Sequence, residues 1–115
     1  MKAININTDS HLTNLASLPK KGTIRLGDVT GKYSEDEVIW ITAGNSNVGK
    51  KKICTAVIDR LKVKTVADLN PEDMQFENPT ANCTNKIQAH LSTVYNTLVT
   101  PNDTVTVITY YELTE

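Results

Sequence analysis

Hydrophobic and polar residues alternate along several stretches of the chain in the way that half-buried strands require. The longest of these stretches is rich in β-branched residues and is long enough to bend or to carry a bulge. The pattern therefore predicts a sheet built from segments that are spread over the whole chain. These stretches are residues 1–7, 23–26, 38–42, 52–63 and 104–111.

Three other stretches predict helices. Polar residues at 8–10 can cap a short helix that Pro19 stops. A second helix is predicted to start at Asn70, because a cap residue is followed by proline at the first position and by acids in the first turn. From about residue 82 to 98, apolar residues recur at i, i+4, i+7, i+8 and i+11, so this helix has one apolar face. That face is Ile87, Leu91, Val94, Tyr95 and Leu98.

The order of these elements sets the fold class. One strand and one helix come first, then several strands, two helices and a last strand. This order has too few strand–helix alternations for a parallel doubly wound sheet. We therefore predict an α+β fold, a small and mostly antiparallel β-barrel with flanking helices. The 115 residues contain no repeat or linker and form a single domain, 1–115.

Composition and charge exclude several function classes. The net charge is -1 and the pI about 6.1, so a nucleic-acid contact would have to come from a local patch. No apolar run approaches the ~20 residues of a membrane span, and the start lacks the apolar core of a signal peptide, so we expect a cytoplasmic protein without membrane contact. Cys54 and Cys83 lack metal-type spacing, and we expect reduced thiols, no metal and no cofactor.

The stretch "ITAGNSNVGKKKIC" carries most of a phosphate-binding loop. Gly44, Gly49 and Lys50 have the right spacing, but Lys51 stands where the hydroxyl that holds magnesium is needed. A β-branched run follows it, where the loop would need a helix. We therefore predict a hairpin loop that does not bind nucleoside triphosphates. Lysines 50–52 are then either a solvated tip or a phosphate contact.

Five stretches of the chain, in their order and spacing, resemble the ASCH domain family, a relative of the PUA RNA-binding fold. They are "KKGTIRLGD", "DEVIWIT", "KKICTAVIDRLKVKTVADLNPEDMQFEN", "NKIQAHLSTVY" and "VTVITYYEL". The resemblance covers about residues 18 to 113. One branch of the family, of about this size, hydrolyses the acetyl amide of N4-acetylcytidine, and the chain is most similar to that branch.

The resemblance to that branch implies three catalytic residues, Lys20, Thr23 and Glu77. Lys21, one residue along, is the alternative to Lys20. Arg25 lies on the same strand as the threonine. With Lys21 and Trp40 it completes the expected substrate-binding set.

The chemistry of these residue types is consistent with amide hydrolysis. A threonine hydroxyl becomes a nucleophile when a base takes its proton, and a lysine can be that base only if desolvation lowers its pKa. A nearby glutamate raises the lysine pKa, unless the glutamate is protonated and donates to the leaving nitrogen. Alternation puts Thr23 and Arg25 on one face of their strand and their apolar neighbours on the other.

Each of these residues also has a structural interpretation. The lysines can be solvated charges, Arg25 an ion-pair partner, and Trp40 a core residue in place of a stacking platform. His11 and His90 have no partner spacing and are interpreted as non-catalytic. Three hypotheses follow: an amidohydrolase acting on a modified nucleoside, a non-catalytic module that binds RNA or a modified nucleotide, and a ribonuclease. The oligomeric state is not predicted.

Overall fold

The computed structural model describes residues 2–6, 20–45, 49–77 and 83–113. The predicted short helix after residue 8 lies outside these ranges. The described residues form five strands, two α-helices and one 3-10 turn, Val66–Asp68. The strands are β1 (Ala3–Ile6), β2 (Lys20–Leu26), β3 (Val38–Asn45), β4 (Gly49–Thr65) and β5 (Thr104–Glu112). The helices are α2 (Pro71–Glu77) and α3 (Thr84–Tyr95).

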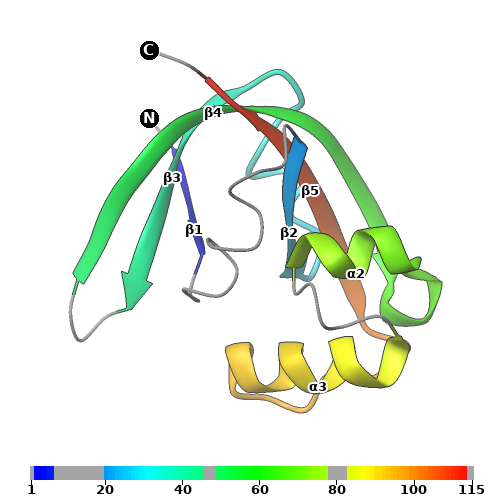
Figure 1. Cartoon of the computed structure of the whole chain (residues 1–115). Coiled ribbons are helices and arrows are strands. Elements are labelled where there is room, and N and C mark those ends of the chain that lie inside the picture. The colour runs from blue at the N-terminus through cyan, green and yellow to red at the C-terminus, as the bar shows by residue number, and fades with distance from the viewer. Residues whose placement is uncertain (1, 7–19, 46–48, 78–82, 114–115) are drawn as a thin grey trace.

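The strands form one sheet in the order β1-β3-β4-β5-β2. The pair of β1 and β3 is parallel, and the other three pairs are antiparallel. Figure 1 shows the sheet curved into an arch, with β1 near one foot and β2 near the other. The mostly antiparallel α+β class is confirmed. The closed barrel is wrong, because β1 and β2 are the two edges of the sheet and do not pair with each other.

Strand β4 makes the arch. It has 17 residues and crosses the whole molecule, pairing first with β3 and then with β5. Register shifts occur between Ile41 and Thr42 of the β3 pair and between Ile58 and Arg60 of the β5 pair. An extra residue in a ladder bends its strand and increases the local twist. The predicted bend or bulge in this long strand is therefore confirmed.

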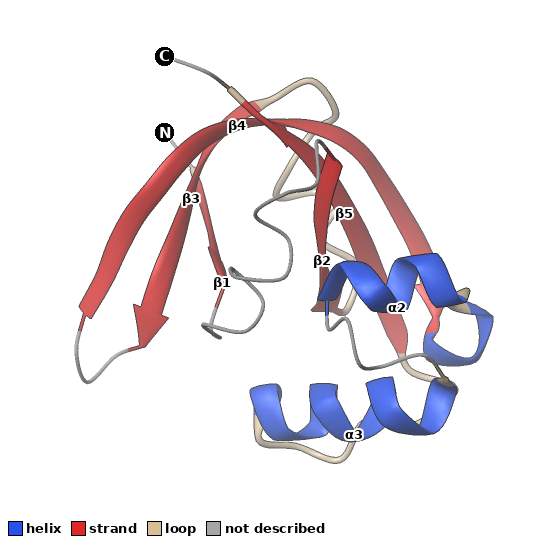
Figure 2. Ribbon diagram, in the orientation of Figure 1, coloured by secondary structure: helices blue, strands red, loops and turns tan. Residues whose placement is uncertain are grey.

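Two apolar clusters cover the two faces of the sheet. One cluster lies against the helices, which Figure 2 shows beside β2 and β5. It consists of Ile24, Val66, Leu69, Met74, Ile87, Leu91, Val99, Val105 and Val107. The other cluster lies on the opposite face and consists of Ile4, Tyr33, Ile39, Ile41, Ala56, Ile58, Ile108 and Tyr110. Strand β5 supplies both clusters, so its residues 105–110 are all buried.

The helix starts and ends follow local chemistry. Helix α2 begins at Pro71 as predicted, and the Asn70 side chain accepts a hydrogen bond from the Asp73 amide at 2.8 Å. Helix α3 ends at Tyr95 because Asn96 takes a left-handed conformation, with φ 51°. The prediction that the apolar face continues to Leu98 is wrong, since Leu98 is 80% exposed. No helix among the described residues is long and apolar enough to cross a membrane.

The stretch that resembles a phosphate-binding loop is part of a hairpin. Gly49, Lys50 and Lys51 lie in β4 and pair with Asn45, Gly44 and Ala43 of β3. A phosphate-binding loop would need a helix at this point, whose first amides face the phosphates. The prediction of a strand connection is therefore confirmed.

Candidate functional site

Alternate residues of β2 carry the polar groups of the candidate site. Lys21, Thr23 and Arg25 pair with Tyr110, Ile108 and Thr106 of β5. Paired residues of neighbouring strands share a face, and Ile108 and Tyr110 belong to the apolar cluster that faces away from the helices. The three polar residues therefore lie on that same face, next to an apolar floor.

Lys21, Thr23 and Arg25 form a row on β2, and Lys21, at one end of this row, forms an ion pair. Its Nζ donates to Glu112 Oε2 at 2.6 Å. The Lys21 side chain is 13% exposed and that of Glu112 is 48% exposed. Glu112 comes two residues after Tyr110, the partner of Lys21, so the ion pair directs the lysine head to the side of Lys21 away from Thr23.

Thr23 lies in the middle of the row and is 2% exposed. Consecutive residues on one face of a strand are separated by about 7 Å, a span that a lysine or arginine side chain can cover. Along the strand, Thr23 therefore occupies the position between two cationic residues, Lys21 and Arg25.

Arg25 connects the two edges of the sheet. Its Nη2 donates to the backbone carbonyl oxygen of Asn5, in β1, at 2.6 Å. Its Nε is closed to solvent and has no hydrogen-bond partner among the described residues. The Asn5 side chain in turn accepts a hydrogen bond from Thr42 Oγ1 of β3 at 2.9 Å. One donor of the guanidinium is thus bound to a neutral acceptor and another is left unmatched.

Two predicted catalytic residues, Lys20 and Glu77, are placed only by their backbones. Lys20 pairs with Tyr111, so its register position has the opposite parity to Thr23. Glu77 is the last residue of α2, and α2 packs against β2. Their side chains lie outside the described residues. Parity places Lys21, and not Lys20, beside Thr23 on the strand.

Trp40 is not brought together with Thr23. Its neighbours Ile39 and Ile41 belong to the cluster on the Thr23 face, so Trp40 lies on the opposite face of β3. It is 40% exposed, and the interpretation as a core residue is therefore wrong. Its exposure leaves the aromatic ring accessible, but on the far side of the sheet from Thr23.

Sequence reasoning missed Glu112 and Asn5. Both contact predicted site residues, but they come from strands 91 and 20 residues away in sequence. Glu112 follows the closing strand predicted from the alternation, so an antiparallel pairing with β2 would have placed it near Lys21. The sequence contains no signal that identifies which two strands pair.

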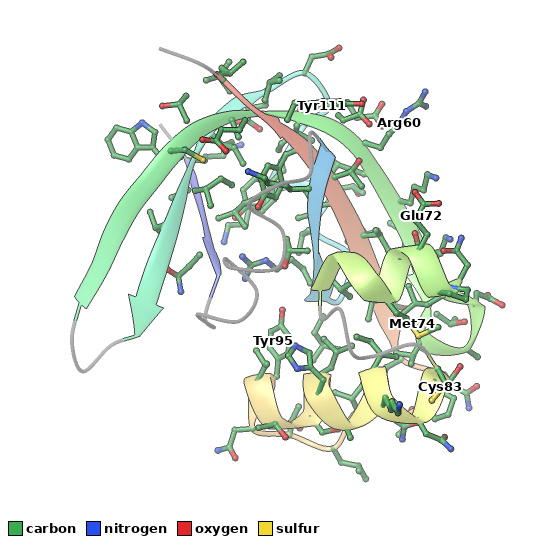
Figure 3. The ribbon with its side chains drawn as sticks, in the orientation of Figure 1. Arg60, Glu72, Met74, Cys83, Tyr95 and Tyr111 are labelled. Carbon is green, nitrogen blue, oxygen red and sulfur yellow. The ribbon has the colours of Figure 1, made fainter. Side chains whose placement is uncertain are left out.

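A cavity of about 370 Å³ lies elsewhere, at the end of β2. Leu26, Gly27, Thr97, Leu98, Asp103 and Thr104 line it. Figure 3 shows Tyr95 pointing from α3 toward the sheet near this end, and its hydroxyl accepts a hydrogen bond from the Leu26 amide at 3.1 Å. The cavity contains neither Thr23 nor its polar neighbours. In the part of the chain that is described, no group of three or more His, Cys, Asp or Glu residues could hold a metal ion.

Two solved structures share this architecture. The crystal structure of an ASCH domain from Lactobacillus crispatus matches with a TM-score of 0.65 and 9% sequence identity, over 96% of this chain and 78% of that one. This chain has the ASCH-domain fold. Protein EF3133 from Enterococcus faecalis matches with a TM-score of 0.64 and 12% identity, over 98% of this chain and 80% of that one. The sequence matches no protein-family model and no curated protein.

Proposed function

We propose that this ASCH-fold protein removes the acetyl group from N4-acetylcytidine or a similar acylated nucleoside, with Thr23 as the nucleophile. One observation carries the proposal: Lys21, Thr23 and Arg25 occupy alternate positions on one face of β2, and a carboxylate contacts the lysine. A hydroxyl, a group that can move a proton and a cationic donor are the parts that acyl transfer needs.

The reaction follows from these parts. The Thr23 oxygen attacks the acetyl carbonyl carbon, and the hydroxyl proton passes to the Lys21 amine. The bond from that carbon to the cytosine nitrogen then breaks, and the nitrogen leaves with the proton from Lys21. Water hydrolyses the acetyl ester on Thr23, which releases acetate and restores the hydroxyl.

Two conditions apply to this scheme. Lys21 accepts a proton only after its own extra proton has moved across the 2.6 Å contact to Glu112. Glu112 is 48% exposed, so the bound substrate must exclude water from the pair before this transfer becomes favourable. Thr23 is 2% exposed, so the atoms that cover it must move, and the Lys21 head must turn from Glu112 toward Thr23, before its hydroxyl can attack.

We assign the role of the base to Lys21 in place of Lys20, because Lys21 lies on the same face of β2 as Thr23 and Lys20 has the opposite parity. Glu77, at the end of a helix that packs on β2, stays the predicted acid and is the alternative to Lys21 as the donor of the leaving nitrogen's proton. Glu112 is added as the group that exchanges a proton with the lysine, since it is the carboxylate within hydrogen-bond distance of Lys21.

The test is deacetylation of N4-acetylcytidine by the purified protein, followed by chromatography of cytidine. Thr23→Val keeps the shape of the side chain but removes the nucleophile, so the rate should fall at least about 1000-fold. Thr23→Ser should keep part of the rate. Lys21→Ala should lose about 100-fold or more, whereas Lys20→Ala should be mild. Melting temperatures of the variants should stay close to that of the wild type.

The outcomes separate the three hypotheses. Wild-type rates in Thr23→Val contradict the nucleophile. Tight binding of oligoribonucleotides that weakens steeply with salt, with no nucleoside turnover, identifies a binding module instead. Cleavage of the oligoribonucleotide identifies a ribonuclease.

A further inference from the structure

Arg25 is a partly buried cation that has no counter-ion among the described residues. Three lysines of the described part of the chain pair with a carboxylate: Lys2 with Glu37, Lys21 with Glu112, and Lys64 with Asp73. Within the same ranges, the one hydrogen bond of the Arg25 guanidinium goes to a neutral carbonyl oxygen. A charge removed from water is costly unless it is paired and fully hydrogen-bonded.

The unmatched donor lies on a defined edge of the guanidinium. Nε and Nη2 of an arginine share one edge of the planar group, and their N–H bonds point in the same direction. In Arg25, Nη2 is bound to the Asn5 carbonyl oxygen, and Nε has no partner in the described residues. A carboxylate or phosphate presents two oxygens at the spacing of this edge and binds both donors together. The single carbonyl oxygen therefore leaves at least Nε of this edge without an acceptor.

The neighbouring charges do not remove this mismatch. Glu112 contacts Lys21 at 2.6 Å, so the one described carboxylate that contacts the row on β2 is already paired. Within the described ranges, no carboxylate therefore compensates the charge of Arg25 on the face that carries Thr23. An anionic ligand would both supply the missing charge and fill the missing acceptor.

We infer that Arg25 binds an oxyanion of the ligand, either a phosphate or a carboxylate, through Nε and Nη2. The oxyanion replaces the Asn5 carbonyl as the acceptor of Nη2, and this replacement opens Nε, which is closed to solvent in the structure. The inference rests on the proposed function for the nucleoside part of the ligand. It adds that the ligand is charged: a nucleotide, or a nucleoside whose acyl group ends in a carboxylate.

The arginine Nε–H group can be observed directly by two-dimensional ¹H–¹⁵N NMR. The chain has two arginines, so the spectrum contains one signal from the site and one from Arg60, which is exposed on β4. Figure 3 shows Arg60 at the outer side of the arch, which makes it a matched internal control. The probes are cytidine, cytidine 5′-monophosphate, inorganic phosphate and malonate.

Cytidine 5′-monophosphate should shift the Arg25 Nε–H signal to saturation and leave the Arg60 signal in place. It should bind about tenfold or more tightly than cytidine, since hydrogen bonds to a charged group are the stronger ones. Arg25→Gln should remove this difference, and Arg60→Gln should not. If malonate shifts the signal and the monophosphate does not, the anion is a carboxylate of the acyl group.

The inference is overturned if none of the three anions shifts the Arg25 signal, or if the monophosphate shifts it and still binds no more tightly than cytidine. The wild-type spectrum alone decides this, so a poorly folded Arg25→Gln does not affect the result. Turnover of neutral N4-acetylcytidine is measured separately. Turnover without an anion-induced shift contradicts only the charged ligand, and an anion-induced shift without turnover contradicts only the hydrolase.

Discussion

Asp73 joins a helix start to a strand through one buried carboxylate. The residue is 5% exposed, and its Oδ2 accepts hydrogen bonds from Lys64 Nζ at 2.5 Å and from the Asn70 amide at 3.3 Å. Lys64 lies on β4 and Asn70 immediately precedes α2. The acid in the first turn also interacts favourably with the helix dipole. Asp73 therefore fixes the position of α2 against the sheet, and α2 packs against the strand that carries the site.

Asp73→Ala should lower the free energy of unfolding by about 2 kcal/mol. The change removes both hydrogen bonds to Oδ2 and leaves the Lys64 ammonium, 22% exposed, without its partner. Urea denaturation measures the loss. Glu72, an exposed acid in the same turn, is the matched control, and Glu72→Ala should change stability by no more than about 0.5 kcal/mol. Equal effects of the two variants would show that the pair contributes nothing specific.

The strands and helices could be predicted from the sequence where the signal, such as alternation or a helix cap, lies within a single element. Alternation located all five strands, and the cap at Asn70 located α2, because these signals are local. The end of α3 was missed, since Asn96 stops the helix before the apolar pattern ends. The pairing of β2 with β5 could not be predicted from the sequence either, because the register depends on contacts between segments about 85 residues apart. Glu112 reaches the site only through that register.

Helix α3 contains a titratable group that should make the stability depend on pH. His90 is half-buried, and burial lowers the pKa of its imidazole below the ordinary value of 6.5. The folded state therefore holds fewer protons than the unfolded state just below pH 6.5, and stability is lost as pH falls through this window. His90→Gln should flatten the dependence of unfolding free energy on pH there, as measured by urea denaturation at several pH values. An unchanged slope in the variant would assign the acid sensitivity to other groups.

The whole molecule is an arch in which the Arg25 side chain links the two edge strands of the sheet. Solved structures with 9% and 12% identity share its architecture, so the fold depends on the pattern of apolar positions and much less on particular residues. The site is different in kind. Its residues must have particular functional groups at particular register positions, and a chain pattern specifies neither the strand partners nor the contact between Arg25 and Asn5. For this reason the sequence predicted the α+β class and could not predict that the sheet stays open.

The Arg25 contact should control how firmly β1 is held at its edge. Among the described residues, β1 pairs with β3 alone, and its carbonyl oxygens also accept hydrogen bonds from Tyr33 Oη, at 3.1 Å to Ala3, and from Arg25, at 2.6 Å to Asn5. Edge strands with few partners open locally without unfolding the rest of the molecule. Arg25→Met removes one of these links and leaves the β4–β5 ladder intact.

Amide hydrogen exchange followed by NMR measures this opening strand by strand. In Arg25→Met, the amides of β1 should exchange about tenfold faster or more, the ratio expected for loss of a hydrogen bond from a charged donor. The amides of β5, which lies between β4 and β2, should keep their wild-type rates. Arg60→Met, the control on the exposed part of β4, should change neither strand. A uniform acceleration in all strands would indicate global destabilisation, and unchanged exchange in β1 would mean that the pairing with β3 alone holds this edge of the arch.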